Sequence, residues 1–320
     1  MPYAILCSGG DSPGMNACIE FAFKKAREDG EDLLGIIGGF SGLARGEIIS
    51  LEGKVEGIGR FGGTILRTSR SRDFATPNGK IAILHHIKDN KIKGVIVLGG
   101  DGSMRDGVPF LCELGIPTVG IPCTIDDDVP LTQSIGFDSA CNKALQLLDS
   151  IKDTALALPE RLFVLETLGG RTGHIAVAVA YSGGADFVCI PEIPFDEEML
   201  VKKMEEKASK RGWAICVVAE GVGGYKIADT LEKKLGIRVR LTAIGHAQRG
   251  GSPSYKDRFL AKALSEEAVR ALEQGESAIM IGWRDEKIVR VDIEELRRKT
   301  KEVSYHLYQA VNRCETSSNP

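Results

Sequence analysis

The sequence lacks strong net charge, long apolar runs and paired cysteines, and each absence excludes a class of protein. The formal net charge is -3, from 41 basic and 44 acidic residues, so no strong field favours a nucleic-acid partner or a membrane surface. No apolar run approaches the length of a membrane span, and the N-terminus has no basic-then-apolar signal. The chain is therefore expected to be a soluble enzyme that acts on small molecules.

The eight cysteines are scattered, and no pair has the Cys-x-x-Cys spacing of a metal or redox site. Cys7, Cys189 and Cys216 lie in apolar, strand-like runs, which predicts reduced, buried thiols in a cytoplasmic protein. The sequence also has no G-x-x-x-x-G-K-[ST], H-E-x-x-H or G-x-S-x-G. Residues 57–62 match G-x-G-x-x-G, but no amphipathic helix follows them, so a Rossmann dinucleotide site is not expected.

Glycine is abundant, with 38 residues, and much of it follows short apolar runs, where tight strand-to-helix turns need it. These runs predict buried parallel strands at 3–6, 33–37, 94–98, 118–121, 162–165, 187–190, 214–218 and 238–244. Segments with helical spacing lie between them, among others at 15–28, 139–152, 197–210 and 257–272. The pattern predicts an α/β fold of two doubly wound domains, with largely parallel central sheets and helices on both faces.

Two glycine-rich turns follow predicted strands, at residues 7–16 (CSGGDSPGMN) and 99–103 (GGDGS). Glycines let backbone amides approach an anion, and a following helix N-terminus adds partial positive charge. In the second turn Asp101 can hold magnesium, directly or through water. Each turn has a plainer interpretation as a tight connection without a ligand.

Three acidic residues, Asp126, Asp127 and Asp128, stand in a row between Pro122 and Pro130. Adjacent carboxylates repel and resist ionising beside each other, so such a cluster needs a cation, an arginine or a proton-transfer task. If the loop is extended, Asp126 and Asp128 point to one side and Asp127 to the other. Thr124 can donate to a transferred phosphoryl group. A phosphate-wrapping turn near these carboxylates predicts phosphoryl transfer.

A fourth segment, residues 246–253 (HAQRGGSP), follows the last predicted strand of the second half. If its turn is helical, His246 and Arg249 share a face, and both can bind a terminal phosphate. Arg70, Arg161 and Arg240 are further cations near strand ends or in glycine-rich loops. For any one of these arginines, a surface ion pair is the simpler interpretation.

In order and spacing, these segments resemble the phosphofructokinase family of bacterial type, over nearly the whole chain. The resemblance implies Mg²⁺-assisted transfer of the ATP γ-phosphoryl group to the 1-hydroxyl of fructose 6-phosphate, a step of glycolysis, by a homotetramer with sites shared between subunits. It further implies a nucleotide-binding domain of residues 1–137 plus about 250–300. A sugar-phosphate-binding domain would then comprise residues 138–249 plus about 301–320.

The resemblance also assigns roles to single residues. It implies that Asp126 is the base and Asp128 its acidic neighbour, and the implied catalytic set is Asp126, Thr124, Asp128, Arg70 and Arg171. The implied nucleotide-binding residues are Gly10, Arg70, Ser71, Gly100, Asp101, Gly102 and Ser103, with Asp101 serving magnesium. The implied substrate-binding residues are Thr124, Asp126, Arg161, Leu168, Gly169, Gly170, Glu220, Arg240, His246 and Arg249, with Arg161 and Arg240 reaching a neighbouring subunit.

Several positions depart from the family pattern. Where the family has Met-Gly-Arg, this chain has residues 168–170 (LGG) with Arg171 one place later, so either Arg171 reaches round or Arg70 works alone. Cys123 stands where ATP users have glycine and pyrophosphate users lysine, and Gly102 where pyrophosphate users have aspartate. This small, neutral pair favours ATP. Glu20 and Gly53 replace basic residues of the effector site, which predicts weak or absent regulation by ADP.

Alternatives remain open at this point. Pyrophosphate can be the donor, or another ketose phosphate, such as sedoheptulose 7-phosphate, the acceptor, since the 168–171 loop is altered. A catalytically silent paralogue that senses nucleotides or sugar phosphates is a candidate of a different class, and the intact Asp101, Thr124, Asp126 and Asp128 argue against it. A kinase acting on NAD or a lipid would explain residues 99–103 only.

Overall fold

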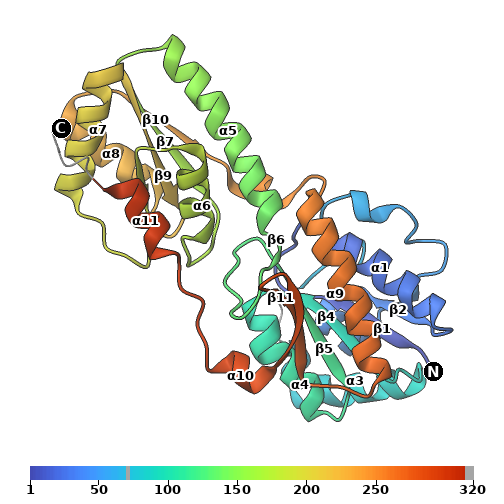
Figure 1. The fold of residues 1–320 in the computed structure, drawn as a ribbon. Coiled ribbons are helices and arrows are strands. Elements are labelled where there is room, and N and C mark those ends of the chain that lie inside the picture. The colour runs from blue at the N-terminus through green and yellow to red at the C-terminus, as the bar shows by residue number, and fades with distance from the viewer. Residues whose placement is uncertain (70–72, 314–320) are drawn as a thin grey trace. The chain divides into compact units, whose positions relative to one another are not determined.

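The computed structural model describes residues 1–69 and 73–313, and the chain divides into two compact units (Figure 1). Unit 1 comprises Met1–Ser139 and Arg249–Lys301, and unit 2 comprises Ala140–Gln248 and Glu302–Pro320. The predicted domain boundaries lie within two residues of these limits. What each unit binds stays a prediction.

Unit 1 is built on an eight-stranded sheet in the order β12-β11-β5-β4-β1-β2-β3, with β6 paired to β5. Its strands are β1 (Tyr3–Cys7), β2 (Leu33–Ile36), β3 (Ile48–Ser50), β4 (Val95–Gly99), β5 (Thr118–Thr124), β6 (Ile135–Gly136), β11 (Ile279–Arg284) and β12 (Lys287–Asp292). The inner strands run parallel, whereas β3 and β12 close the two edges antiparallel. Both faces of the inner strands are buried: Ile5 of β1 packs into one core and Leu6 into the other.

Helices cover both faces of this sheet. On one face lie α1 (Met15–Glu28) and α9 (Tyr255–Glu273), which run side by side in Figure 1. Met15, Cys18, Ile19 and Ala22 recur at helical spacing and give α1 its apolar stripe. The other face is covered by α2 (Gly39–Arg45), α3 (Pro77–Asp89), α4 (Val108–Glu113) and α10 (Ile293–Arg297). Short turns complete unit 1: η1 (Ile58–Arg60), η2 (Asp73–Ala75) and η3 (Ser103–Gly107).

Unit 2 has a four-stranded parallel sheet in the order β10-β7-β9-β8. Its strands are β7 (Arg161–Thr167), β8 (Phe187–Cys189), β9 (Trp213–Ala219) and β10 (Val239–Ala243). One face packs against α7 (Glu197–Arg211) and α8 (Gly224–Leu235), and α6 (His174–Gly183) and α11 (Tyr305–Asn312) lie on the other side (Figure 1). Two elements span the unit boundaries, α5 (Phe137–Ala157) and η4 (Gly245–Arg249).

The predicted fold class is confirmed, since both units are doubly wound around largely parallel sheets. All eight predicted strands are present, and α1 has the predicted bounds. The sequence did not predict the β11–β12 hairpin, which adds an antiparallel edge to the parallel sheet. Seven cysteines lie in the described ranges and carry free thiols, and burial raises the pKa of Cys7 to about 12.

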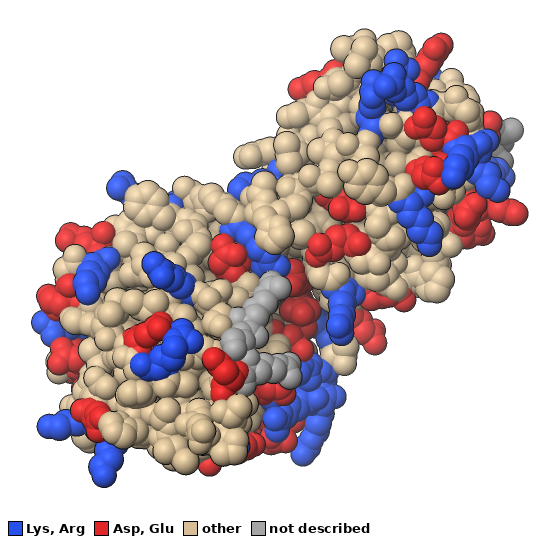
Figure 2. All heavy atoms as spheres, turned by 180° about the vertical axis from the view of Figure 1, so that it is seen from behind, with Lys and Arg blue, Asp and Glu red and all other residues tan. Residues whose placement is uncertain are grey.

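The surface matches the balanced composition. On the face shown in Figure 2, basic and acidic side chains are interspersed on both units. None of the helices in the described part of the chain is long and apolar enough to cross a bilayer.

Asp257 of α9 holds the connection that leaves unit 1. Its carboxylate is fully buried and accepts hydrogen bonds from the backbone N–H groups of Gly136 and Ser139, at 2.8 Å each, and from the Ser139 hydroxyl at 2.5 Å. Asp257→Ala would leave these buried donors unpaired. We expect it to lower the free energy of unfolding of unit 1 by about 2–4 kcal/mol.

Each unit contains one of the two tryptophans, Trp283 in unit 1 and Trp213 in unit 2. In a Trp213→Phe background, Trp283 fluorescence during urea denaturation therefore reports on unit 1 alone. The exposed Asp89→Ala variant is the control and should cost less than about 0.5 kcal/mol. An Asp257→Ala midpoint as high as that of the control would contradict the prediction.

Candidate active site

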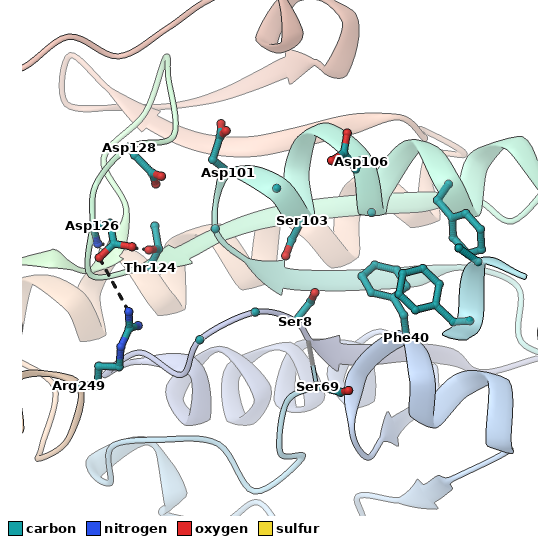
Figure 3. Close-up of a pocket in the computed structure, with 18 residues that line it drawn as sticks. Ser8, Phe40, Ser69, Asp101, Ser103, Asp106, Thr124, Asp126, Asp128 and Arg249 are labelled. Atoms are coloured by element: carbon teal, nitrogen blue, oxygen red, sulfur yellow. Dashed lines mark hydrogen bonds and ion pairs between the residues drawn. The ribbon is translucent and has the colours of Figure 1, made fainter. Parts of the chain in front are cut away.

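A cavity of about 630 Å³ opens at the carboxyl ends of β1, β4 and β5 (Figure 3). The loop after each of these strands contributes to its wall: Ser8, Gly9 and Gly10 after β1, residues 100–103 after β4, and Asp126 and Asp128 after β5. In parallel α/β sheets ligands gather at this edge, and the volume is typical of a site for a small molecule. The predicted glycine turns and two residues of the acidic cluster, Asp126 and Asp128, thus line one cavity.

Two of the glycines leave room for side chains that line the cavity. A Cβ atom at Gly100 would lie 3.3 Å from Cβ of Thr124, and one at Gly10 would lie 2.6 Å from the Arg249 guanidinium. A Cβ atom at Gly102 would meet no atom within 4 Å. The loop after β4 then continues into η3, a π-helical turn of a kind that is frequent at functional sites. The glycines therefore expose backbone to the cavity, and the space beside Gly102 is open to a ligand.

Asp126, Asp128 and Asp101 form the acidic end of the cavity (Figure 3). The backbone N–H of Asp126 donates to the Thr124 hydroxyl at 3.2 Å, which fixes the start of the loop. Burial, and then the charges of Asp126 and Asp101, raise the pKa of Asp128 to about 6. Oδ1 of Asp128 is buried and has no hydrogen-bond partner in the described residues. This end of the cavity is suited to a cation.

Protein cations already offset part of this charge. Nη2 of Arg249 lies 4.0 Å from Oδ1 of Asp126, and the same guanidinium donates to the Asp11 carbonyl at 3.1 Å. Nε of Arg105 donates to Oδ1 of Asp101 at 2.6 Å. The sequence placed Arg249 with His246 on a phosphate and gave Arg105 no role.

Asp127 does not line the cavity. It points away from the side of Asp126 and Asp128, as the sequence predicted, but through a left-handed backbone (φ 51°) and not through an extended one. Its Oδ1 accepts from the backbone N–H of Ser134 at 2.9 Å and pairs with Lys301 Nζ at 2.8 Å. The acidic triplet is therefore divided between the cavity and an internal ion pair.

The carboxylate oxygens of the cavity fit magnesium better than a metal whose ligands all come from protein side chains. In the described ranges no group of three His, Cys, Asp or Glu residues is arranged to hold a metal ion. Magnesium commonly takes one or two carboxylates and completes its shell with water and substrate phosphates. Asp101 and the unpartnered Oδ1 of Asp128 are donors of this kind.

The opposite end of the cavity is aromatic, which the sequence did not predict (Figure 3). Phe40 of α2 and Phe74 of η2 stack with centroids 5.0 Å apart, and Phe110 of α4 meets Phe74 edge-on at 5.1 Å. These residues stand far apart in the sequence, on three different elements. No local sequence signal separates a phenylalanine that lines a cavity from one that fills a core.

The remaining predicted residues are divided between unit 2 and the residues without description. Arg161 and Arg240 lie on the neighbouring strands β7 and β10, on the same face, because Arg240 pairs in register with Phe163, two residues beyond Arg161. His246 and Arg171 are exposed. Arg70 and Ser71 lie outside the described residues. The structure thus gathers Gly10, Gly100, Asp101, Gly102, Ser103, Thr124, Asp126, Asp128 and Arg249 around the cavity of unit 1.

The loop after β7 is held by Glu220, which was predicted to bind sugar hydroxyls. Oε1 of Glu220 accepts from the N–H groups of Gly169, at 3.2 Å, and Gly170, at 2.6 Å. Gly170 has a left-handed φ of 61°, which favours glycine at this position. Leu168 is buried and its N–H donates to the Gln248 side chain at 2.8 Å. Glu220 therefore fixes the backbone of the predicted substrate loop.

Glu20 is buried, and its carboxylate is bound by two backbone N–H groups of unit 1. Its carboxylate accepts from the N–H groups of Gly57, at 3.2 Å, and Gly59, at 2.8 Å, and pairs with Lys24 at 2.5 Å. Burial alone would raise the pKa of Glu20, but the bonds from Lys24, Gly59 and Gly57 hold the pKa below its usual value. The Glu20 carboxylate therefore takes up two backbone N–H groups, of Gly57 and Gly59, that could otherwise bind an anion.

Comparisons with known proteins agree with this architecture. The family model named Phosphofructokinase matches residues 2–272. The ATP-dependent 6-phosphofructokinase of Natranaerobius thermophilus is 44% identical over 310 residues, which is 95% of this chain and 96% of that protein. The structure of phosphofructokinase from Saccharomyces cerevisiae is similar with a TM-score of 0.87 at 29% identity, over 93% of this chain and 45% of that chain.

A pyrophosphate-dependent phosphofructokinase from Marinobacter aquaeolei has a TM-score of 0.86 at 20% identity, over 99% of this chain and 93% of that chain. At this identity the likeness shows the fold alone. The family model spans most of the sequence and the Natranaerobius relative nearly all of it. This chain belongs to the phosphofructokinase family.

Proposed function

We propose that this chain transfers the γ-phosphoryl group of ATP to the 1-hydroxyl of fructose 6-phosphate and releases ADP and fructose 1,6-bisphosphate, a step of glycolysis. The observation that carries the proposal is a single cavity with an acidic end, an aromatic end and glycine-rich backbone between them (Figure 3). A nucleoside triphosphate needs these three surfaces in this order, for its terminal phosphate, its base and the phosphates between. The curated relative bears the corresponding name.

The aromatic end supports ATP as the donor. Phe40, Phe74 and Phe110 offer ring faces and edges on which a purine can pack. Pyrophosphate has no apolar part and would leave this end of the cavity without a function. Gly102 leaves open space beside the phosphate path, and Cys123 is buried in β5 and places no charge there.

The reaction breaks the bond between the γ-phosphorus and the β,γ-bridging oxygen of ATP and forms one between this phosphorus and the sugar 1-oxygen. Asp126 takes the hydroxyl proton late in the transfer, because an aspartate is a weak base at neutral pH. Thr124 contacts the transferred group, and Arg249 beside Asp126 limits the carboxylate repulsion. Magnesium held by Asp101 would neutralise phosphate charge. The remaining residues position the reactants.

Unit 2 supplies the proposed sugar-phosphate residues Arg161, Glu220, Arg240 and His246. Arg161 and Arg240 share one sheet face, which supports the proposal that both contact the phosphate of a sugar bound in a neighbouring subunit. The homotetramer and the cytoplasmic location stay predictions. Weak regulation by ADP also stays a prediction, supported by the Glu20 carboxylate on the Gly57 and Gly59 amides.

An assay that crosses ATP and pyrophosphate with fructose 6-phosphate and sedoheptulose 7-phosphate tests the proposal. We expect turnover with ATP and fructose 6-phosphate, and Phe74→Ala should raise the KM for ATP about 5–10-fold, since an aromatic contact is worth about 1 kcal/mol. The KM for the sugar should not change. Phe259→Ala, which removes a ring packed on Trp283 elsewhere in unit 1, is the control. Turnover with pyrophosphate alone would overturn the donor, and ATP binding without turnover would favour a silent paralogue.

Asp126→Asn tests the assigned base. The amide keeps the size of the side chain but cannot accept the hydroxyl proton, so we expect kcat to fall roughly 10²–10⁴-fold with little change in either KM. Asp106→Asn, which alters a carboxylate of the same cavity beyond Ser103, should keep kcat within about threefold. Unchanged turnover in Asp126→Asn would remove the base from the mechanism.

The raised pKa of Asp128, about 6, predicts a pH-dependent affinity for magnesium nucleotide. A nearby cation favours the ionised carboxylate, so binding below this pKa must release a proton and becomes weaker. From about pH 7.5 to about pH 5.5 the Kd of MgADP, measured by calorimetry, should rise about fourfold beyond the change that the nucleotide itself causes. Asp128→Asn has no carboxylate to titrate at this position, so its Kd should show only the pH dependence that the nucleotide itself causes. Equal pH slopes in both proteins would contradict the prediction.

A further inference from the structure

One short segment of unit 1 contacts both acidic loops of the cavity. Residues 296–301, here called the strap, run from the end of α10 to the last residue of unit 1. Arg105 connects the strap to the loop after β4, and Lys301 connects it to the loop after β5. Sequence motifs gave neither residue a role.

Arg105 uses both sides of its guanidinium. Nε donates to Oδ1 of Asp101 at 2.6 Å, while Nη1 and Nη2 donate to three carbonyls of the strap. These carbonyls belong to Leu296, at 3.2 Å, Arg297, at 2.9 Å, and Lys299, at 2.6 Å. Arg297 in turn donates from its Nε to the Arg105 carbonyl at 2.8 Å. The planar fork of an arginine can make these contacts together, and a lysine ammonium cannot.

Lys301 makes the second connection. Its Nζ lies 2.8 Å from Oδ1 of Asp127 and donates to the Thr132 carbonyl at 2.6 Å. It therefore joins both ends of the loop from 127 to 132. The Asp127 and Lys301 side chains are only 12% and 22% exposed, so solvent screens their pair less than a surface pair. Asp127 also sits in the left-handed region, which few residues other than glycine, asparagine and aspartate adopt.

From this geometry we infer that Arg105 and Lys301 are positioning residues for phosphoryl transfer. Lys301 holds the left-handed turn at Asp127, and that turn sends Asp126 and Asp128 into the cavity on either side of it. Arg105 holds Asp101 against the same strap, so the two acidic loops keep a fixed spacing. The inference rests on the proposed function for its effect on turnover, because small misplacements of catalytic groups are costly to rate.

Lys301→Met tests the first connection. We expect kcat to fall about 10–100-fold with the KM for ATP within about threefold, since binding groups stay and geometry is lost. Lys301→Arg, which keeps the charge, should recover most of kcat. Lys301→Met combined with Asp127→Asn should lose no more than Lys301→Met alone, because the two residues act as one pair. Lys299→Met, which removes an exposed side chain of the strap, is the matched control and should behave as wild type.

Arg105→Lys tests the second connection. Lysine keeps a cation for Asp101 but cannot bind the three strap carbonyls together, so we expect kcat to fall at least about tenfold. Wild-type turnover in Arg105→Lys would show that Arg105 serves only as a counter-ion of Asp101 and would overturn its positioning role.

Hydrogen exchange supplies a readout that needs no turnover. Lys301→Met should increase amide exchange in residues 126–134, and Arg105→Lys in residues 99–107, whereas Lys299→Met should change neither. Unchanged exchange would overturn the inference that Arg105 and Lys301 hold the two acidic loops. Increased exchange with unchanged kcat would show that their contacts stabilise the loops without positioning catalytic groups. A wild-type protein that phosphorylated no sugar would refute the proposed function, and the exchange pattern would then still decide whether the strap holds the loops.

Discussion

Asp101, Asp126 and Asp128 lie around one cavity, and their mutual repulsion is the constraint on which the rest of the site depends. Burial, and then the charges of Asp126 and Asp101, raise the pKa of Asp128, and one oxygen of Asp128 has no hydrogen-bond partner within the described residues. Arg249 offsets Asp126 from a distant segment of the chain, and Arg105 offsets Asp101 from the turn that follows it. A site with this imbalance favours the arrival of a cation, and a magnesium nucleotide brings one together with the phosphates that complete its coordination.

The acidic end alone would suit any phosphoryl donor, and the aromatic end narrows the choice. Phe40, Phe74 and Phe110 pack against one another across three separate elements and form an apolar wall in the cavity that also contains the carboxylates (Figure 3). The two ends favour different parts of a ligand. The aromatic end buries apolar ring surface, and the acidic end binds a cation. A ligand with a base at one end and phosphates at the other satisfies both, which is the reason that ATP is preferred over pyrophosphate.

Much of the fold and part of the site could be predicted because their signals are local. A run such as β4 is apolar at every position, so its burial on both faces and the turn that follows it can be predicted from the sequence. The turn at Gly100 and the loop at Asp126 each follow such a strand, and the parallel arrangement then brings them to one edge. The β11–β12 hairpin was not predicted, because an antiparallel edge departs from the alternation of strands and helices along the rest of the chain.

The α/β class, the glycine loops and the carboxylates after β5 can be predicted from the amino-acid sequence alone, since each depends on residues that are neighbours in the chain. Which phenylalanines line the cavity depends on the packing of the chain, and so do the contact of Arg105 with the strap and the contact of Lys301 with Asp127. The position of Arg249 beside Asp126 also depends on this packing. These contacts join segments more than a hundred residues apart or elements packed on one sheet face, and no local pattern encodes them, because they arise from how helices such as α4 and α10 pack on the sheet.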